Sequence, residues 1–523
     1  MDAIDQLISF NRTTGLLQSV AGRNAWDQET MMPSKSGNSR AMEMGALEEV
    51  IHDRKKNSKV RKLLEEAEPK TTFQKRAYTL IKRDFDRAVA IPSELASDLA
   101  ATTSLAQMAW QKARQNNDFS EFSPHLNKVI DLKREEASLL SPTGDLYDGL
   151  INDYEFGMTK KETASIFEEM KPRLLDLRQR ISETKLSKPV LEGDFNTEKQ
   201  LKLAHEIAKT FFYDFDRGRI DTVAHPFCSG GGDDVRITTR VDSKDPFNCL
   251  YSTIHEVGHA CYEQNVSSDF LHSPLGSGIS LGIHESQSRI FENQIGRSRQ
   301  FTKWLFKKMK SYFGEFGIRD EEEFYRLVNK VETGFIRTEA DEVHYNLHIM
   351  LRFELEVEVI GKNLEVPDLP EAWNAKFKDY FGRDVEKFSD GILQDVHWSI
   401  GAFGYFPTYT LGNLNAGCLF EKMRKDIPSL EDRFEKGDVS LATTWLTENI
   451  HQHGSLYEPA DLIKKATGKD FTPEPFLNYL DEKLIKYENN SKENIYKNDL
   501  INYENEISKS ISKSEYNLSL IHI

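Results

Sequence analysis

The sequence predicts a mainly α fold with one small β element. Apolar residues recur at helical spacing along most of the 523 residues. A strand pattern occurs in one region only, where charged or hydroxyl residues alternate with Val and Ile. The length would allow two or three domains, but no internal repeat of fixed period is visible.

The expected helices follow one another with short breaks. Thr159 and Glu162 form a T-x-x-E capping box, and Pro172 should kink or break the helix that they open. Ser93, just after a proline, should cap another helix. A first helix begins near Ile4, and further helices are expected over residues 40–68, 73–87, 94–116, 285–296, 301–313, 321–331, 336–360 and 371–381.

A β-hairpin is expected directly before the most informative motif. Its arms are residues 222–227 and 234–241, and the glycines at 230–232 form the turn. A strand beside a cleft can pair with an extended peptide through backbone hydrogen bonds, although a small stabilising hairpin fits the pattern equally well.

The motif that organises the chain is H-E-x-x-H at His255 to His259. On a helix, this spacing places both imidazoles on one face, one turn apart, so that they can share a zinc ion. Glu256 then lies beside the ion, where it can take a proton from bound water. The simpler alternative is a surface helix that carries two histidines and a glutamate.

A catalytic zinc site needs a third protein ligand and one open position. Glu285 fills this role if the Gly- and Ser-rich segment 273–280 lets two antiparallel helices meet. His284 is the competing ligand. Glu285 is favoured because no H-x-x-G-x-x-H extension follows to supply a third histidine.

Composition narrows the class of protein. The formal net charge is −16, from 84 acidic and 68 basic residues, which argues against nucleic acid or an anionic membrane as a partner. The four cysteines form no C-x-x-C pair, no signal peptide is recognised, and no apolar run is long enough for a membrane span. We therefore expect a soluble cytoplasmic protein. Residues 488–523 are predicted to be a low-complexity tail, disordered or weakly helical.

Several separate blocks carry a family resemblance. They are H-P-F at 225–227, D-x-R-x-T at 234–238, H-E-x-x-H at 255–259, H-E-S-Q at 284–287, I-R-x-x-A-D at 336–341 and G-x-x-Q-D-x-H-W at 391–398. In this order they resemble the carboxypeptidase Taq family of zinc-dependent metallocarboxypeptidases. The resemblance covers residues 1–487, the expected catalytic unit, and the tail 488–523 departs from it.

The resemblance implies a helical, two-sided body with a deep central groove, similar in shape to neurolysin- and angiotensin-converting-enzyme-like peptidases. It implies a homodimer that removes single residues from peptide C-termini with broad preference, using one zinc ion per chain, with cobalt as a substitute. By motif correspondence, the metal ligands would be His255, His259 and Glu285, and Glu256 would be the general base and acid.

An exopeptidase also needs a cation for the free carboxylate of its substrate. Arg337 is the first choice because a guanidinium binds a carboxylate through two hydrogen bonds, and Arg236 is the second, unless it only braces the hairpin through Asp234. His225 would hold the substrate backbone or support another site residue. Candidate donors to the oxyanion are Tyr345, His397 and Tyr409.

The sequence is also compatible with two other functions. The same zinc site would serve an endopeptidase or a dipeptidyl carboxypeptidase. A metal-bound scaffold or peptide-binding protein without turnover is the other alternative, and Glu256 weighs against it because a scaffold needs no base.

Overall fold

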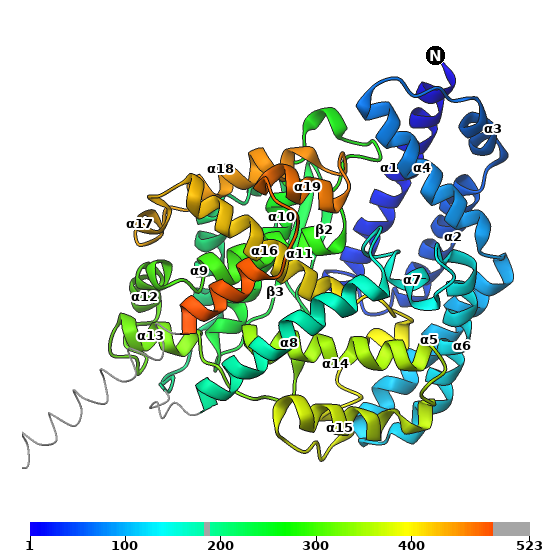
Figure 1. The fold of residues 1–523 in the computed structure, drawn as a ribbon. Helices are drawn as coiled ribbons and strands as arrows, with labels where there is room; N and C mark the ends of the chain where they lie inside the picture. Colours follow the sequence, from blue (N-terminus) through cyan, green and yellow to red (C-terminus); the bar gives the residue numbers. More distant parts are fainter. Residues whose placement is uncertain (183–188, 485–523) are drawn as a thin grey trace, which may run out of the picture.

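The computed structural model describes residues 1–182 and 189–484 and is predominantly helical. At its centre lie α10 (Pro246–Gln264), α11 (Leu281–Arg289) and α16 (Pro407–Asp426), with a small sheet beside α10 (Figure 1). The predicted helical body with one small sheet is therefore confirmed. The tail 488–523 lies outside the described residues. None of the described helices is both long and apolar enough to cross a lipid bilayer.

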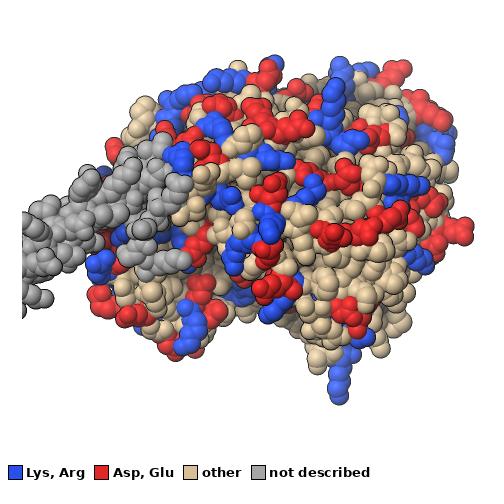
Figure 2. Space-filling view, turned by 60° about the horizontal axis from the view of Figure 1, so that its bottom comes forward, with Lys and Arg blue, Asp and Glu red and all other residues tan. Residues whose placement is uncertain are grey.

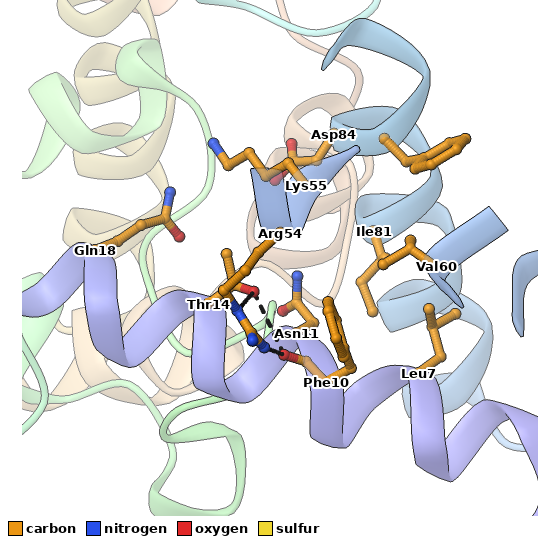
Figure 3. Close-up of a pocket in the computed structure, with 11 residues that line it drawn as sticks. Leu7, Phe10, Asn11, Thr14, Gln18, Arg54, Lys55, Val60, Ile81 and Asp84 are labelled. Atoms are coloured by element: carbon orange, nitrogen blue, oxygen red, sulfur yellow. Dashed lines mark hydrogen bonds between the residues drawn. The ribbon is translucent and has the colours of Figure 1, made fainter. Parts of the chain in front are cut away.

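The N-terminal helices surround a core that we name after α1 (Ala3–Thr30), the α1 core. It includes Leu7 and Ile81, and Leu275 from the segment before α11 also packs into it. Arg54 crosses from α2 to α1, where Nε donates to Thr14 Oγ1 (3.0 Å) and Nη2 donates to the Phe10 carbonyl (2.9 Å) (Figure 3). The small cavity beside these residues is lined by the N-terminal helices alone. These helices are α1 (Ala3–Thr30), α2 (Gly37–Lys55), α3 (Ser58–Glu66) and α4 (Thr72–Ala90).

A second group of helices surrounds the α14 core, which includes Leu174, Leu351 and Phe377. Its helices are α5 (Ser93–Asn116), α6 (Ser123–Leu140), α7 (Leu146–Ile151), α8 (Lys160–Ser182), α14 (Glu342–Ile360), α15 (Leu369–Phe381) and the helical residues 474–484.

A third group surrounds the α10 core, which includes Ile254, Val257 and Ile290. Helix α16 belongs to both groups, because Leu414 packs in the α14 core and Leu419 in the α10 core. Besides α10, α11 and α16, the third group contains α9 (Thr197–Thr210), the π-helix η4 (Ile290–Ile295), α12 (Arg299–Phe313), α13 (Glu321–Val328), α17 (Leu430–Phe434), α18 (Ser440–Asn449) and α19 (Pro459–Thr467).

Several helix predictions need correction at their ends. The helix expected over 40–68 divides in two because the Asn57 side chain accepts the Lys59 N–H and starts α3. Pro92, not Ser93, occupies the N-cap of α5. The helix expected from residue 285 already begins at Leu281, and the one expected from 336 begins only at Glu342.

The expected capping box is present, since the Glu162 N–H donates to Thr159 Oγ1 and the Thr159 N–H donates to the Glu162 carboxylate. Of the two outcomes expected at Pro172, a kink or a break, the break does not occur, because α8 continues through this residue. Buried Met170 and Leu174 on either side pack into the α14 core, so tertiary packing compensates for the missing backbone hydrogen bond.

The sheet has three strands in the order β1-β3-β2. Strand β3 (Asp234–Thr239) pairs antiparallel with β2 (Cys228–Gly231), which forms the predicted hairpin, and parallel with β1 (Ile220–Thr222). The first predicted arm, 222–227, is wrong, since Pro226 lacks the N–H that a ladder requires and the glycine-rich segment itself pairs.

Short 3₁₀ helices connect the larger elements. They are η1 (Phe119–Glu121), η2 (Phe215–Arg217), η3 (Ser268–Phe270), η5 (Arg337–Glu339), η6 (Val366–Asp368), η7 (Phe388–Asp390), η8 (His397–Ile400) and η9 (His451–His453). On the face shown in Figure 2, acidic and basic side chains are intermixed.

Candidate active site

Helix α10 carries the H-E-x-x-H motif through the interior of the protein. Asp245 caps the helix and Pro246 occupies its first turn, so its start is fixed locally. Gly258, inside the motif, lies against α11, where a Cβ atom would come within 2.5 Å of Ser288 Cα. The absence of a side chain at this position therefore lets the two helix backbones touch.

The two helices bring three potential ligands together. The Nε2 atoms of His255 and His259 lie 3.7 and 3.6 Å from the same oxygen of Glu285, Oε2. Ligands at roughly 2.0–2.2 Å from a shared tetrahedral ion are separated by about 3.3–3.6 Å, so the spacing fits such an ion. Within residues 1–182 and 189–484, this is the one group of three or more such side chains close enough to hold a metal.

Glu285 is held from two sides. Arg289 Nε donates to its Oε1 at 2.6 Å, which leaves Oε2 directed at the imidazoles. On the other side lies Gly412 of α16, where a Cβ atom would come within 2.4 Å of Glu285 Cγ. Helix α16 can therefore press against this carboxylate only with glycine at position 412.

His255 has a carboxylate behind it. Its Nδ1 is 2.9 Å from Glu292 Oε2, and Glu292 in turn accepts hydrogen bonds from Arg289 (3.3 Å) and Arg297 (3.4 Å). A hydrogen bond at Nδ1 leaves the Nε2 lone pair free for a metal. We did not predict Glu292 from the sequence, although its spacing from Glu285 and Arg289 places all three on one helix face.

His284, the competing ligand, is occupied elsewhere. Its Nδ1 lies 2.7 Å from His259 Nδ1, and its Nε2 lies 2.9 Å from Glu263 Oε1. Both of its ring nitrogens are thus engaged, one by His259 and the other by Glu263, and neither is left for a metal. The structure brings Glu285, and not His284, to the two Nε2 atoms.

Burial and charge shift the pKa values in the cluster. Burial raises the pKa of Glu256 to about 7. Burial would lower the pKa of His255, but the carboxylates of Glu285 and Glu292 outweigh it and raise that pKa to about 9. Burial lowers the pKa of His259 well below its usual value. Two imidazoles and a carboxylate, with further carboxylates nearby, form a donor set that suits a divalent cation, whose charge would replace the proton on His255.

The predicted oxyanion donors come from the α14 side of the molecule. His397 Nε2 and the Tyr409 hydroxyl lie 3.4 Å apart. The Tyr345 hydroxyl accepts a hydrogen bond of 2.9 Å from Arg337 Nη1, and the Arg289 guanidinium lies 4.5 Å from the centre of the Tyr345 ring. Tyr345 therefore lies between the arginine that holds Glu285 and Arg337.

Arg337 is buried and already has an anionic partner. Its Nη2 donates to Asp395 Oδ1 at 2.8 Å, while Arg352 Nε donates to the other oxygen of the same carboxylate at 2.7 Å. Two guanidinium groups thus share one carboxylate, which leaves a local excess of positive charge.

Arg236 and His225 are placed differently. Arg236 donates twice to Asp234, at 2.7 and 3.0 Å, and its guanidinium lies 4.5 Å from the centre of the Trp26 ring. These contacts fit a brace between β3 and α1. His225 is exposed in the segment between β1 and β2.

A cavity of about 370 Å³ lies beside residues that hold the cluster in place. Arg289, Glu292 and Tyr345 form part of its wall, and residues 327–332 and 339–343 form another part. None of the three potential ligands is among its lining residues, so the cavity lies beside the residues that support the cluster.

A buried H-E-x-x-H helix with a third carboxylate ligand, set in a helical body, defines the class of metal-dependent peptidases. The chain belongs to the carboxypeptidase Taq (M32) metallopeptidase family, whose sequence profile matches residues 6–484. It is therefore a metal-dependent carboxypeptidase by family.

Named relatives agree with this assignment. The chain is 39% identical over 500 residues to thermostable carboxypeptidase 1 of Thermus thermophilus, covering 92% of this chain and 98% of the relative. It is 37% identical over 495 residues to thermostable carboxypeptidase 1 of Pyrococcus furiosus, covering 92% and 99%. The crystal structure of the M32 carboxypeptidase from Deinococcus radiodurans superposes with a TM-score of 0.90 at 37% identity, covering 93% of this chain and 99% of that one.

Proposed function

We propose that this carboxypeptidase releases single C-terminal amino acids from peptides with broad specificity. The proposal depends chiefly on one observation, the convergence of His255, His259 and Glu285 beside the buried Glu256. These three side chains would hold one zinc ion per chain, with cobalt as a functional substitute. When bound, such an ion polarises the scissile carbonyl and lowers the pKa of water in the site.

Glu256 is the proposed general base and acid. It accepts a proton from the attacking water and returns this proton to the leaving amine. Its neighbour His255 is held in place by Glu292. Because Glu256 and both histidines lie on α10, the position of the Glu256 carboxylate relative to the proposed ligands is set by the helix.

Arg337 is the proposed anchor for the substrate carboxylate. Asp395 is shared with Arg352, and the remaining positive charge attracts a free C-terminus. Since Arg236 is paired with Asp234 and Trp26, we assign it the bracing role. Because His225 is exposed beside β2, we propose that it contacts the substrate backbone.

Three side chains are proposed to donate to the oxyanion. The Tyr345 hydroxyl accepts from Arg337, so its own proton is free to donate to a substrate oxygen. His397 and Tyr409 face each other and form a second pair of donors.

The first experiment replaces Glu256 by Gln. Loss of a general base costs roughly 10²–10⁴-fold in rate, so turnover of a peptide with a free C-terminus should fall by that factor. Metal content, measured by elemental analysis, should stay at one ion per chain because no ligand is changed. Retention of most of the activity would remove Glu256 from the base role.

We also expect a cytoplasmic homodimer, which follows from the family resemblance and from the low cysteine content. The four cysteines are free, which suits a reducing compartment. Light scattering of the purified protein measures the oligomeric state directly, and a monomer at micromolar concentration would contradict the expectation.

A further inference from the structure

The two histidines of the cluster are supported in different ways. His255 Nδ1 meets a carboxylate directly, Glu292 Oε2 at 2.9 Å. His259 Nδ1 meets another imidazole, His284, at 2.7 Å, and only beyond it comes a carboxylate, Glu263 Oε1 at 2.9 Å from His284 Nε2. An imidazole can act as donor or acceptor at either nitrogen, so the contact between His259 and His284 has no direction of its own.

Glu263 determines which of the two histidines donates in this contact. An ionised carboxylate only accepts hydrogen bonds, so His284 must carry its proton on Nε2. A neutral His284 then has a lone pair on Nδ1, and His259 must donate to it from Nδ1. His259 Nε2 is therefore left unprotonated on the side that faces Glu285.

The opposite placement of the protons, with His284 donating to His259, is unfavourable at Glu263 and at Glu285. If His284 donated from Nδ1, its Nε2 lone pair would face the Glu263 carboxylate. At the other end, His259 would carry its proton on Nε2, toward Glu285 Oε2 and in place of a metal. One carboxylate thus decides which nitrogen of His259 is open.

The surroundings of Glu263 support this assignment. Its side chain is 9% exposed, and the same oxygen, Oε1, also accepts the Gly278 N–H at 3.0 Å. In the described part of the chain, its one ion-pair partner is His284, so no Lys or Arg competes for the carboxylate. The His284 ring is restrained by Tyr262, whose ring centre lies 5.2 Å away.

We propose that Glu263 is a positioning residue that acts through His284 to fix the tautomer of His259 and so keep its Nε2 ready for the metal. The proposal rests on the proposed function, because it takes His259 as a ligand. It predicts that metal affinity depends on Glu263, although Glu263 is not one of the three proposed ligands.

The test measures zinc affinity of the metal-free protein by competition with a chromophoric chelator. Glu263→Met and His284→Leu each remove an acceptor and should weaken zinc binding by roughly 10- to 100-fold. Glu263→Gln keeps an oxygen for both His284 and Gly278, and His284→Asn keeps Oδ1 where Nδ1 was, so both should bind within a few-fold of wild type. Glu354→Met removes a carboxylate that bonds to Lys171 and Lys376 instead, and it should bind zinc as wild type does.

The decisive comparison is a double-mutant cycle. Because His284→Asn cuts the link to Glu263, adding Glu263→Met to it should weaken zinc binding no further. The same loss in both backgrounds, or wild-type affinity of Glu263→Met alone, would overturn the proposal. A wild-type protein that takes up no metal would instead refute the proposed function, so the two failures are distinguishable.

A second measurement needs no variant and holds even if a substitution prevents folding. Neutron diffraction from zinc-loaded wild-type crystals should show deuterium on His259 Nδ1 and on His284 Nε2. Deuterium on His284 Nδ1 would refute the relay.

Discussion

Gly412 offers a direct test of how the proposed metal site is built, because one added methyl group on α16 should displace the Glu285 side chain. A Cβ atom at this position would lie 2.4 Å from Glu285 Cγ and 2.6 Å from Glu285 Cβ. Non-bonded carbons prefer about 3.5–4.0 Å, so Gly412→Ala must separate α16 and the Glu285 side chain by about 1 Å. Neither side can yield easily, since both atoms of Glu285 lie close to the α11 backbone.

The expected loss follows from this displacement. Metal–oxygen distances tolerate about 0.2 Å, so a shift of about 1 Å should remove Glu285 as an effective ligand. Overpacking of this kind also costs about 1–3 kcal/mol of stability. A misplacement of this size at a reacting centre lowers the rate by about 10²-fold, and kcat/KM should fall accordingly.

Gly417, five residues further along α16, is the matched control. A Cβ atom there would come within 2.6 Å of Phe476, so Gly417→Ala also overpacks α16, but against the helix at 474–484. Both variants should lower the Tm, whereas only Gly412→Ala should lose zinc affinity and turnover. Gly412→Ala with wild-type zinc affinity and kcat/KM would refute the view that this contact positions Glu285.

Three further predictions concern the substrate, the metal and pH. Arg337→Ala should raise KM for peptides with a free C-terminus by roughly 10- to 100-fold, the value of one charge-assisted hydrogen-bonded contact, and an equal loss on amidated peptides would contradict the anchoring role. Removal of the metal with a chelator should lower the Tm, because an ion that binds the folded protein and not the unfolded chain stabilises the fold, and calorimetry before and after adding zinc measures the difference. Burial raises the pKa of Glu356 to about 7, above the roughly 4.3 of an unfolded Glu, so the folded state holds more protons between these values and stability falls as pH rises through 7. Glu356→Gln should flatten the Tm between pH 5 and 8, and an unchanged slope would reject this assignment.

Local signals in the sequence were sufficient for much of the fold. The T-x-x-E pattern at Thr159 predicted a capping box that the structure contains. The spacing of His255 and His259 placed two imidazoles one turn apart, and the rings indeed adjoin. These features depend on residues at most four apart, where helix geometry alone fixes the relation.

Features that join distant segments could not be predicted in this way. Nothing near Gly412 in the sequence indicates that it faces Glu285, 127 residues earlier. Glu263 and His284 likewise meet only because Gly258 lets α10 and α11 touch. The helix through Pro172 shows the same limit, since packing in the α14 core decided an outcome that local propensity opposed.

The arrangement of the cores explains why these long-range contacts matter for catalysis. The proposed ligands project from helices of the α10 core, whereas Tyr345 packs in the α14 core and Tyr409 packs against it. Contacts that fix one side relative to the other include Gly412 against Glu285, and Glu155, which accepts the Gly282 N–H at 2.9 Å at the start of α11. The metal would bind on one side, and the proposed oxyanion donors lie on the other. A shift between the two sides would therefore separate them, even with every residue of the site unchanged.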